Sequence, residues 1–258
     1  MKLIITETDP GLLAAEYLKA LIRKRGPNPF TIAFPTGSTP ARMYKHLIAL
    51  YKAGELSFKN VISFNLDEYT GLDAARPESY HSYMRRNLFG HVDMQPQNIN
   101  IPDGNAKDIN VFCGQYEAKI KFCGGIDLFL GGVGTNGHIA FNEPGSPFDS
   151  RTRQVFLTEE TIKDNARFFG GDIKAVPKSA ITMGLGTILE AREIIILAAG
   201  QNKAAAIRQA VEGRQNTAWP ITALQSHKNI YIVADKAAAG EISRGALKEH
   251  EVCCLGGL

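Results

Sequence analysis

The sequence predicts an α/β protein, a single three-layer αβα domain whose sheet is mainly parallel, Rossmann-like and doubly wound. Two observations favour this fold class. Short apolar segments typical of buried strands alternate with segments of helical periodicity along the 258 residues. Glycine-rich or polar loops follow several of the apolar segments, as they do at the ligand-binding edge of such a sheet. Because no repeat, low-complexity tract or linker interrupts the alternation, residues 1–258 are expected to form one domain.

The first half of the chain alternates strands and helices regularly. Strands are expected at 3–5, 31–34 and 61–64, and helices from Asp9-Pro10 to Gly26-Pro27 and around 43–51, 80–88 and 109–120. The first helix has the clearest start, because Asp9 is a favourable N-cap and Pro10 suits the first helical position. The glycine-proline pair at 26–27 then ends it.

The second half continues this alternation. Strands are expected at 126–130, 155–157, 193–198 and 230–233, with a helix holding Lys203, Ile207 and Val211 and a last helix beginning near Asp235. Segment 193–198 is the most clearly apolar of these strands. The polar residues at about 157–180 are expected to form a mobile lid over a site, and are named the lid segment.

Charge and cysteine usage narrow the function classes. Lysine and arginine number 29 against 26 acidic residues, and the net charge of +3 is too small to indicate a nucleic-acid or membrane partner. Glu7 follows the first residues too closely for a signal peptide, and no apolar run approaches transmembrane length. The four cysteines, Cys113, Cys123, Cys253 and Cys254, show no C-x-x-C or metal-like spacing. We interpret them as reduced thiols of a cytoplasmic protein.

Residues 131–145 are the strongest candidate for a catalytic loop. Glycines after an apolar strand let backbone amides approach a ligand, and a carboxamide, an imidazole and a carboxylate follow at Asn136, His138 and Glu143. Imidazole titrates near neutral pH and can accept and return a proton, so His138 is the candidate acid/base, which Glu143 could orient. The alternative is a structural histidine, which the surrounding glycines make less favourable.

The same loop contains a misleading motif. Residues 132–137 fit G-x-G-x-x-G, the dinucleotide-binding pattern, and follow a predicted strand. That pattern must open a helix, because the pyrophosphate lies on the helix N-terminus. Here Pro144-Gly145 follows within a few residues and no helical period intervenes, so a nicotinamide cofactor is not expected.

Two further loops follow predicted strands. Residues 35–40 join a strand to a helix, and their hydroxyls and free amides suit a phosphate, although a plain capping turn fits equally well. Asp67 and Glu68 follow another strand, so their side chains should point to opposite faces and one can face a cleft as a base. The alternative there is a solvated pair at a turn.

Lys203 and Arg167 are candidate cations for a phosphate. Lys203 lies at a helix start just after a strand, and Arg167 lies in the lid segment. Lys203 could also form a Schiff base with a sugar carbonyl, but nothing near it in the sequence predicts a lowered pKa.

These segments together resemble one family. Residues 35–40, 64–69, 132–144 and 165–169 resemble the motifs of the glucosamine-6-phosphate deaminase family, also called glucosamine/galactosamine-6-phosphate isomerases. The similarity runs over nearly the whole chain in the same order. The related 6-phosphogluconolactonases share the fold and a looser version of the loop around His138.

The resemblance implies conversion of glucosamine 6-phosphate and water to fructose 6-phosphate and ammonia, with no cofactor and no metal. It implies that His138 opens the sugar ring, assisted by Asn136 and Glu143, and that Asp67 moves the C2 proton. The lid segment would correspond to the family's lid.

The resemblance also implies a binding site for the substrate phosphate. Its residues would be Gly37, Ser38, Thr39, Arg167 and Lys203. The phosphate would serve as a remote handle whose binding energy orients the reacting carbons.

Two departures from the family pattern bear on regulation and tuning. Many members have an aspartate where this chain has Asn136, so His138 lacks that charge beside it. Members activated by N-acetylglucosamine 6-phosphate use a serine, an arginine and a lysine. Ser146 and Arg153 match, but Val155 replaces the lysine, so no such activation is expected.

Three functions remain open on these residues. The first is the deaminase, a small-molecule enzyme that could form a homo-oligomer, since the family contains monomers and hexamers. The second is a lactonase-like hydrolase in which the same histidine activates water. The third is a sugar-phosphate sensor without turnover.

Overall fold

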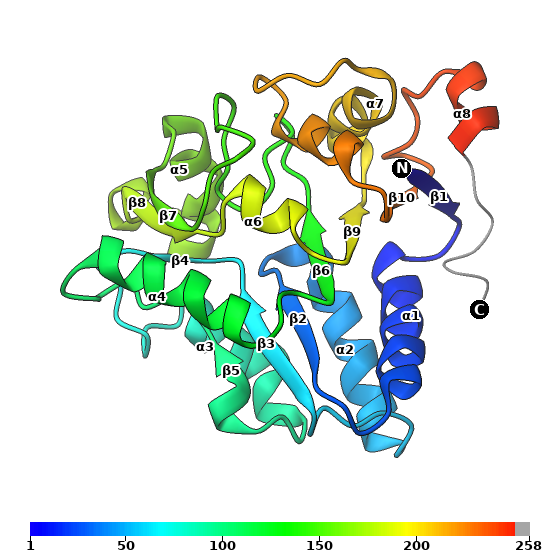
Figure 1. Ribbon diagram of the computed structural model, residues 1–258. Helices are drawn as coiled ribbons and strands as arrows, with labels where there is room; N and C mark the ends of the chain where they lie inside the picture. The colour runs from blue at the N-terminus through cyan, green and yellow to red at the C-terminus, as the bar shows by residue number, and fades with distance from the viewer. Residues whose placement is uncertain (251–258) are drawn as a thin grey trace.

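A computed structural model describes residues 1–250, and its centre is a parallel seven-stranded sheet in the order β1-β10-β9-β6-β2-β3-β5 (Figure 1). The strands are β1 (Lys2–Thr6), β2 (Phe30–Phe34), β3 (Val61–Asn65), β5 (Ile99–Asn100), β6 (Leu128–Gly132), β9 (Glu193–Ala198) and β10 (Ile230–Asp235). The predicted single-domain α/β fold is thereby confirmed.

Helices cover both faces of this sheet. The α-helices of the described residues are α1 (Pro10–Arg25), α2 (Ser38–Lys52), α3 (Tyr80–Asn87), α4 (Ile109–Phe122), α5 (Glu159–Asn165), α6 (Leu185–Leu189), α7 (Ala204–Glu212) and α8 (Arg244–His250). Alternate strand residues divide between two cores: Ile195 packs with the α1 and α2 side, whereas Ile194 and Ile196 pack with the α4 and α7 side. The continuous apolar runs of the strands follow from this burial on both faces.

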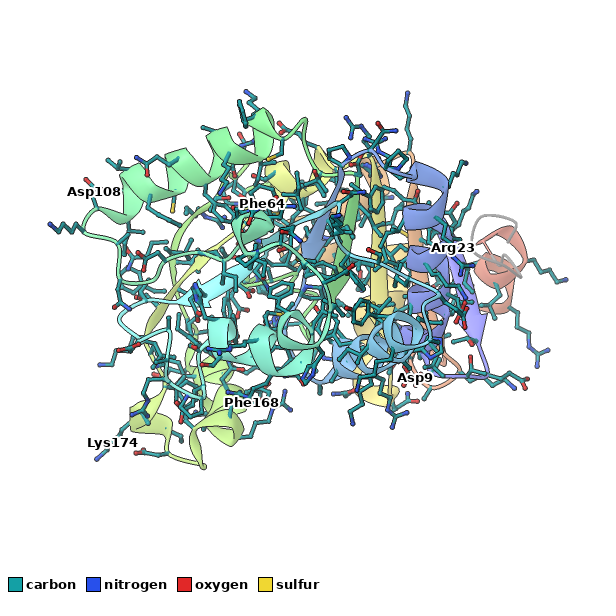
Figure 2. All side chains as sticks on the ribbon, turned by 90° about the horizontal axis from the view of Figure 1, so that it is seen from below. Asp9, Arg23, Phe64, Asp108, Phe168 and Lys174 are labelled. Atoms are coloured by element: carbon teal, nitrogen blue, oxygen red, sulfur yellow. The ribbon has the colours of Figure 1, made fainter. Side chains whose placement is uncertain are left out.

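Local sequence signals explain where several elements begin and end. The Asp9 carboxylate accepts the Gly11 N–H at 2.8 Å, which caps α1, and Gly26 ends that helix at φ 64°. Seen from below, Phe64 of β3 lies in the interior and Asp108 lies at the surface, where its side chain caps α4 (Figure 2).

A second sheet was not predicted. Strands β4 (Asp67–Tyr69), β8 (Ser179–Thr182) and β7 (Arg153–Phe156) form an antiparallel sheet in the order β4-β8-β7. It lies beside α5 at one end of the molecule (Figure 1). Since β4 starts two residues after β3 ends, the small sheet stands directly over the carboxyl end of the main one.

Other expectations need correction. The last helix does not begin near Asp235, because the Asp235 carboxylate accepts the Ala238 N–H at 2.7 Å and holds a turn; α8 begins at Arg244. The strand expected at 126–130 is shifted to β6, and the one expected at 155–157 is shifted to β7.

Two of the four cysteines can be examined in the structure. Cys113 and Cys123 are free thiols, while Cys253 and Cys254 lie outside the described residues. Within residues 1–250, no helix is long and apolar enough to cross a membrane.

Candidate active site

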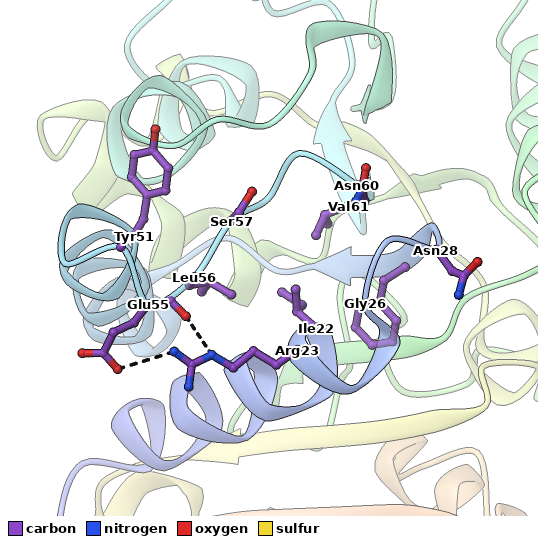
Figure 3. A pocket seen from close by; sticks show the side chains of 12 residues that line it. Ile22, Arg23, Gly26, Asn28, Tyr51, Glu55, Leu56, Ser57, Asn60 and Val61 are labelled. Atoms are coloured by element: carbon purple, nitrogen blue, oxygen red, sulfur yellow. Dashed lines mark hydrogen bonds and ion pairs between the residues drawn. The ribbon is translucent and has the colours of Figure 1, made fainter.

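Cavities open at both ends of the strands of the main sheet. One of about 420 Å³ lies at the amino-terminal ends of β2 and β3, lined by apolar groups such as Ile22 and Leu56 (Figure 3). Its charged lining residues, Arg23 and Glu55, are occupied with each other: the guanidinium donates to the Glu55 carbonyl at 2.9 Å and lies 4.0 Å from its carboxylate. This cavity therefore offers little for acid/base chemistry.

The other cavity, of about 340 Å³, lies at the carboxyl ends of the strands. Loops after β2, β3, β6 and β9 meet there, together with α3 and the lid segment. The predicted residues that line it are Gly37, Ser38, Thr39, Asp67, His138, Arg167 and Lys203. Parallel strands bring their carboxyl ends to one edge, and this explains why residues so distant in sequence share a cavity.

Asn136 and Glu143 lie behind His138 rather than in the cavity wall. The Asn136 side chain donates through Nδ2 to Glu143 Oε2 at 2.9 Å, and its Oδ1 lies 2.8 Å from His138 Nδ1. Glu143 Oε2 is itself 3.6 Å from His138 Nδ1. The amide therefore stands between the carboxylate and the imidazole.

This arrangement assigns the imidazole tautomer. Because the Asn136 amide nitrogen faces the carboxylate, its carbonyl oxygen faces His138 Nδ1, and a carbonyl oxygen only accepts hydrogen bonds. Neutral His138 thus carries its proton on Nδ1. Nε2 keeps a lone pair, which gives the cavity a general base.

The glycines of the loop make room for the ring. A Cβ built on Gly134 would lie 2.2 Å from His138 Cε1, so the imidazole occupies the space a side chain would need. Gly137 has φ 81°, which a residue with a side chain rarely adopts. The loop can hold His138 this way only with glycine at these positions.

Glu143 is charged at neutral pH despite its burial. Burial alone would raise its pKa, but the neighbouring His138 and the donors Thr161 and Asn136 outweigh it, and the pKa lies below its usual value. Hydrogen bonds to a carboxylate favour its ionised form. Glu143 can therefore hold Asn136, and through it His138, in place.

Asp67 has the opposite electrostatic surroundings. Its side chain lines the cavity but only 6% of the residue is exposed. Burial, and then the charge of Glu68, raise its pKa to about 8. No hydrogen bond from the described residues counters these two effects, so the carboxylate is free to take up a proton.

Glu68 turns away from the cavity, as the alternation of strand side chains predicted. Its carboxylate accepts the backbone N–H groups of Tyr69 at 2.9 Å, Tyr80 at 3.1 Å and His81 at 3.1 Å, and its Oε2 lies 2.9 Å from His81 Nδ1. Glu68 thereby fixes the start of α3 beside Asp67. The alternative of a solvated acidic pair is wrong, because both residues are buried.

The turn before α2 has the features of an anion site. Its N-cap is Gly37, with φ 113°, and no side chain of the described residues caps the helix. The first amides of a 15-residue helix are thus directed at the cavity, where the Ser38 and Thr39 side chains also lie. The alternative of a plain Ser/Thr N-cap is not what the structure contains.

Two cations line the same cavity as this turn. Arg167 belongs to the short helix η3 (Ala166–Phe169), and its guanidinium lies 4.8 Å from the centre of the Phe168 ring. Burial, and then the charge of Arg167, lower the pKa of Lys203, with Asp164 partly opposing them. The expectation that nothing lowers the Lys203 pKa is therefore wrong. Two cations that repel each other in a cavity favour a dianionic ligand between them.

Some residues that line the cavity were not predicted from the sequence. Tyr80, Tyr83 and Arg86 of α3 line the cavity, and the Tyr83 hydroxyl donates to the Gly37 carbonyl at 2.5 Å. Their helical spacing indicated only a packed helix face. Nothing local in the sequence shows that this helix lies against residues 35–40.

In the part of the chain that the structure describes, no three His, Cys, Asp or Glu side chains are grouped so that they could hold a metal ion.

The fold and the cavity define a class of protein: an α/β protein with a carboxylate, an imidazole and the uncapped start of a helix in one cavity at the carboxyl ends of its strands. The chain belongs to the family described as Glucosamine-6-phosphate isomerases/6-phosphogluconolactonase, whose pattern matches residues 11–232.

Individual relatives are similar over nearly their whole length. A protein named glucosamine-6-phosphate deaminase from Parabacteroides distasonis is 53% identical over 250 residues, covering 95% of this chain and 93% of that protein. One of the same name from Yersinia enterocolitica is 51% identical over 244 residues, covering 93% and 92%.

Two solved structures frame the fold. One described as a monomeric glucosamine-6-phosphate deaminase is 40% identical, with a TM-score of 0.89 over 93% of this chain and 99% of its own. The 6-phosphogluconolactonase from Trypanosoma cruzi is 21% identical, with a TM-score of 0.74 over 94% of this chain and 97% of its own. At that identity the likeness concerns the fold alone.

Proposed function

We propose that this chain converts glucosamine 6-phosphate and water to fructose 6-phosphate and ammonia, a step of amino-sugar catabolism. One observation carries the proposal: a single cavity is lined by Asp67 and His138, whose carboxylate and Nε2 have no hydrogen-bond partner among the described residues, and by the start of α2, which no described side chain caps. Two relatives, 53% and 51% identical in sequence, are named for this activity.

The first step is ring opening, which we assign to His138. Nε2 takes the proton of the O1 hydroxyl and delivers it to the ring oxygen O5, so the pyranose becomes an open-chain aldehyde. Asn136 keeps Nδ1 protonated and the ring oriented, and Glu143 stabilises the imidazolium that forms in between. No net proton is consumed.

The second step is isomerisation, which we assign to Asp67. The carboxylate takes the proton from C2 while a proton of the C2 ammonium group passes to O1, giving an enolamine, and the carboxyl then returns its proton to C1. The nitrogen on C2 is then an imine, to which water adds. Loss of ammonia from that adduct leaves the ketone of fructose 6-phosphate.

The raised pKa of Asp67 fits a substrate that carries its own charge. Its pKa of about 8 keeps much of Asp67 protonated at neutral pH. The ammonium group on C2 of the bound sugar is an opposite charge beside it, and this lowers the pKa of the carboxyl. The substrate thus generates the base that attacks its own C2.

We assign phosphate binding to Gly37, Ser38, Thr39, Arg167 and Lys203. Amides at a helix start and two cations suit a dianion. Since Arg167 lies in the lid segment, a bound phosphate would hold that segment closed and keep bulk water from the enolamine. We propose that residues 157–180 are the mobile part of the site.

The proposed partner is a small molecule, without nucleic acid or membrane, and the proposed location is the cytoplasm. The oligomeric state stays a prediction: a monomer and a homo-oligomer are both compatible with the sequence, and a similar solved structure is described as monomeric.

Ammonia release tests the function. Purified protein with glucosamine 6-phosphate should release ammonia and fructose 6-phosphate in equal amounts, and 6-phosphogluconolactone should hydrolyse no faster than without protein. The opposite pattern would support the lactonase. Ligand-dependent thermal stabilisation with neither product would support the sensor.

A further inference from the structure

Glu143 has a hydrogen-bond donor that belongs to the lid segment. The Thr161 hydroxyl, in the first turn of α5, donates to Glu143 Oε1. Thr161 is 18 positions away in sequence, is 7% exposed and also lines the cavity. The contact joins the catalytic loop to an element that packs over it.

The direction of this hydrogen bond is fixed. The Thr158 hydroxyl donates to Thr161 Oγ1 at 3.0 Å, and Thr158 Oγ1 accepts the Thr161 N–H at 3.2 Å. An ionised carboxylate can only accept, so the single proton of the Thr161 hydroxyl goes to Glu143. The N-cap of α5 thus holds the donor in place.

The two oxygens of Glu143 serve different partners. Oε1 receives the Thr161 hydroxyl, while Oε2 receives Asn136 Nδ2 at 2.9 Å and faces His138 Nδ1 at 3.6 Å. With Thr161 removed, the carboxylate could rotate away from the amide, because one end would lose its partner. The orientation of Glu143 therefore depends on where α5 lies.

The same segment carries the proposed phosphate contact. Arg167 lies in η3, which follows α5 directly, and the neighbouring Ala166 and Phe169 pack against Tyr69 and Phe141. A phosphate held by Arg167 would keep this short stretch in place. Thr161 would be kept on Glu143 by the same packing.

We propose that Thr161 is a positioning residue that couples closure of the lid segment to the orientation of Glu143, and through Asn136 to His138. The inference rests on the proposed function and adds a role for the substrate's phosphate: it sets the acid/base group at the other end of the sugar. A purely structural role for Thr161 would hold α5 without affecting His138.

Thr161→Val tests the coupling, since it removes the hydroxyl and keeps the shape. We expect kcat for ammonia release to fall roughly 10- to 100-fold, the usual range for losing a hydrogen bond to a charged group. KM should change no more than about threefold, because no phosphate contact is lost. The acid limb of the kcat profile should move to higher pH, because Glu143 loses a donor that favours its charged form.

Three companion variants separate coupling from packing. Thr161→Ser should restore kcat and the pH profile to near the wild-type values. Thr158→Val removes the cap of α5 and the hydroxyl that donates to Thr161 Oγ1 but keeps the Thr161 hydroxyl itself, so it should lower the melting temperature and shift the pH profile less than Thr161→Val does. In a Glu143→Gln background, Thr161→Val should lower kcat little further, because the effects of substitutions at two residues that act as a unit are not additive.

The proposal is overturned by a wild-type pH profile and kcat in Thr161→Val, by Thr161→Ser as slow as the valine variant, or by full additivity with Glu143→Gln. Thr161→Ala takes the place of the valine variant if that protein does not fold. A wild-type protein that releases no ammonia would count against the proposed function instead.

Discussion

Asp67 and Glu143 are carboxylic acids in similarly buried positions, with 6% and 8% of each residue exposed. Their pKa values nevertheless move in opposite directions, up for Asp67 and down for Glu143. Glu143 has donors around it, whereas Asp67 has the negative charge of Glu68 beside it. Groups with pKa values separated in this way are suited to different tasks in one reaction.

Asp67→Asn should remove the base and a destabilising buried charge together. Deamination should fall at least about 10³-fold, within the range for loss of a general base, while substrate binding is largely kept. The folded-state pKa of about 8 lies above the ordinary 3.8, so wild-type stability falls as pH rises between them. The variant lacks this slope, and its melting temperature should exceed that of the wild type by several degrees near pH 8.

Thermal unfolding near pH 5 and near pH 8 checks this, with Asp149→Asn, an exposed carboxylate, as the matched control. The melting temperature of Asp67→Asn relative to the wild type should be higher near pH 8 than near pH 5. The relative melting temperature of the control should be the same at both pH values. Near-normal ammonia release by Asp67→Asn would remove the base role from this residue.

Gly134→Ala should disable His138 without unfolding the protein. The new Cβ would lie 2.2 to 2.4 Å from three ring atoms, so the imidazole has to move. A displacement of about 1 Å at a reacting group costs on the order of 10² in rate. We expect kcat to fall about that much.

The comparison is Gly114→Ala on the exposed side of α4, where a Cβ meets nothing within 4 Å. It should keep full activity and be slightly more stable, because alanine favours the helix. Equal activity of the two variants would contradict the placement of the ring against Gly134.

At the scale of elements, α3 is held at the site by contacts with two residues outside the helix, the Glu68 carboxylate and the Gly37 carbonyl. Glu68→Gln replaces one acceptor oxygen with an amide that cannot accept the His81 N–H. The unsatisfied group should cost about 1–3 kcal/mol, and a loosened α3 should raise KM because Tyr83 contacts Gly37. Loss of the charge should also lower the pKa of Asp67 and move the acid limb of kcat/KM to lower pH.

Kinetics and thermal melting of Glu68→Gln check this prediction. The control is Glu7→Gln, because the Glu7 side chain is 82% exposed. The account requires the acid limb to move only in the first variant. An unchanged limb would show that Glu68 does not influence Asp67.

Elements with a strong local pattern could be predicted from the sequence. The strand predicted at 193–198 has the same bounds as β9. The first predicted helix agrees with α1 because Asp9, Pro10 and Gly26 mark where it begins and ends. The β4-β8-β7 sheet could not be predicted, because its three short strands come from distant segments and owe their pairing to tertiary contacts.

The same distinction between local pattern and tertiary packing applies to the residues of the candidate site. The loops that carry Asp67 and His138 could be found from polar residues after apolar strands, and the resemblance supplied their roles. The contact of Tyr83 with Gly37 and the Thr161 hydrogen bond to Glu143 depend on how α3 and α5 pack. No local pattern contains that information.

At the scale of the whole molecule, the prediction about regulation concerns the contacts of Ser146 and Arg153. The Arg153 guanidinium donates to Asn142 at 2.9 Å and to Ser146 at 3.3 Å, and the half-buried Val155 supplies no third polar contact. We predict hyperbolic saturation by glucosamine 6-phosphate that N-acetylglucosamine 6-phosphate does not alter. A shift from sigmoidal to hyperbolic curves on adding that compound would contradict the prediction.

The sheet as a whole places Asp67, His138 and residues 37–39 together at the carboxyl ends of its strands, although they follow different strands. The central claim is that one hexose phosphate spans them. A crystal structure of Asp67→Asn with glucosamine 6-phosphate bound tests it most directly. We predict the phosphate on residues 37–39 with Arg167 and Lys203, C2 beside residue 67, and the ring oxygen within hydrogen-bonding distance of His138 Nε2. A phosphate bound elsewhere, or a sugar with C2 turned away from residue 67, would contradict the account.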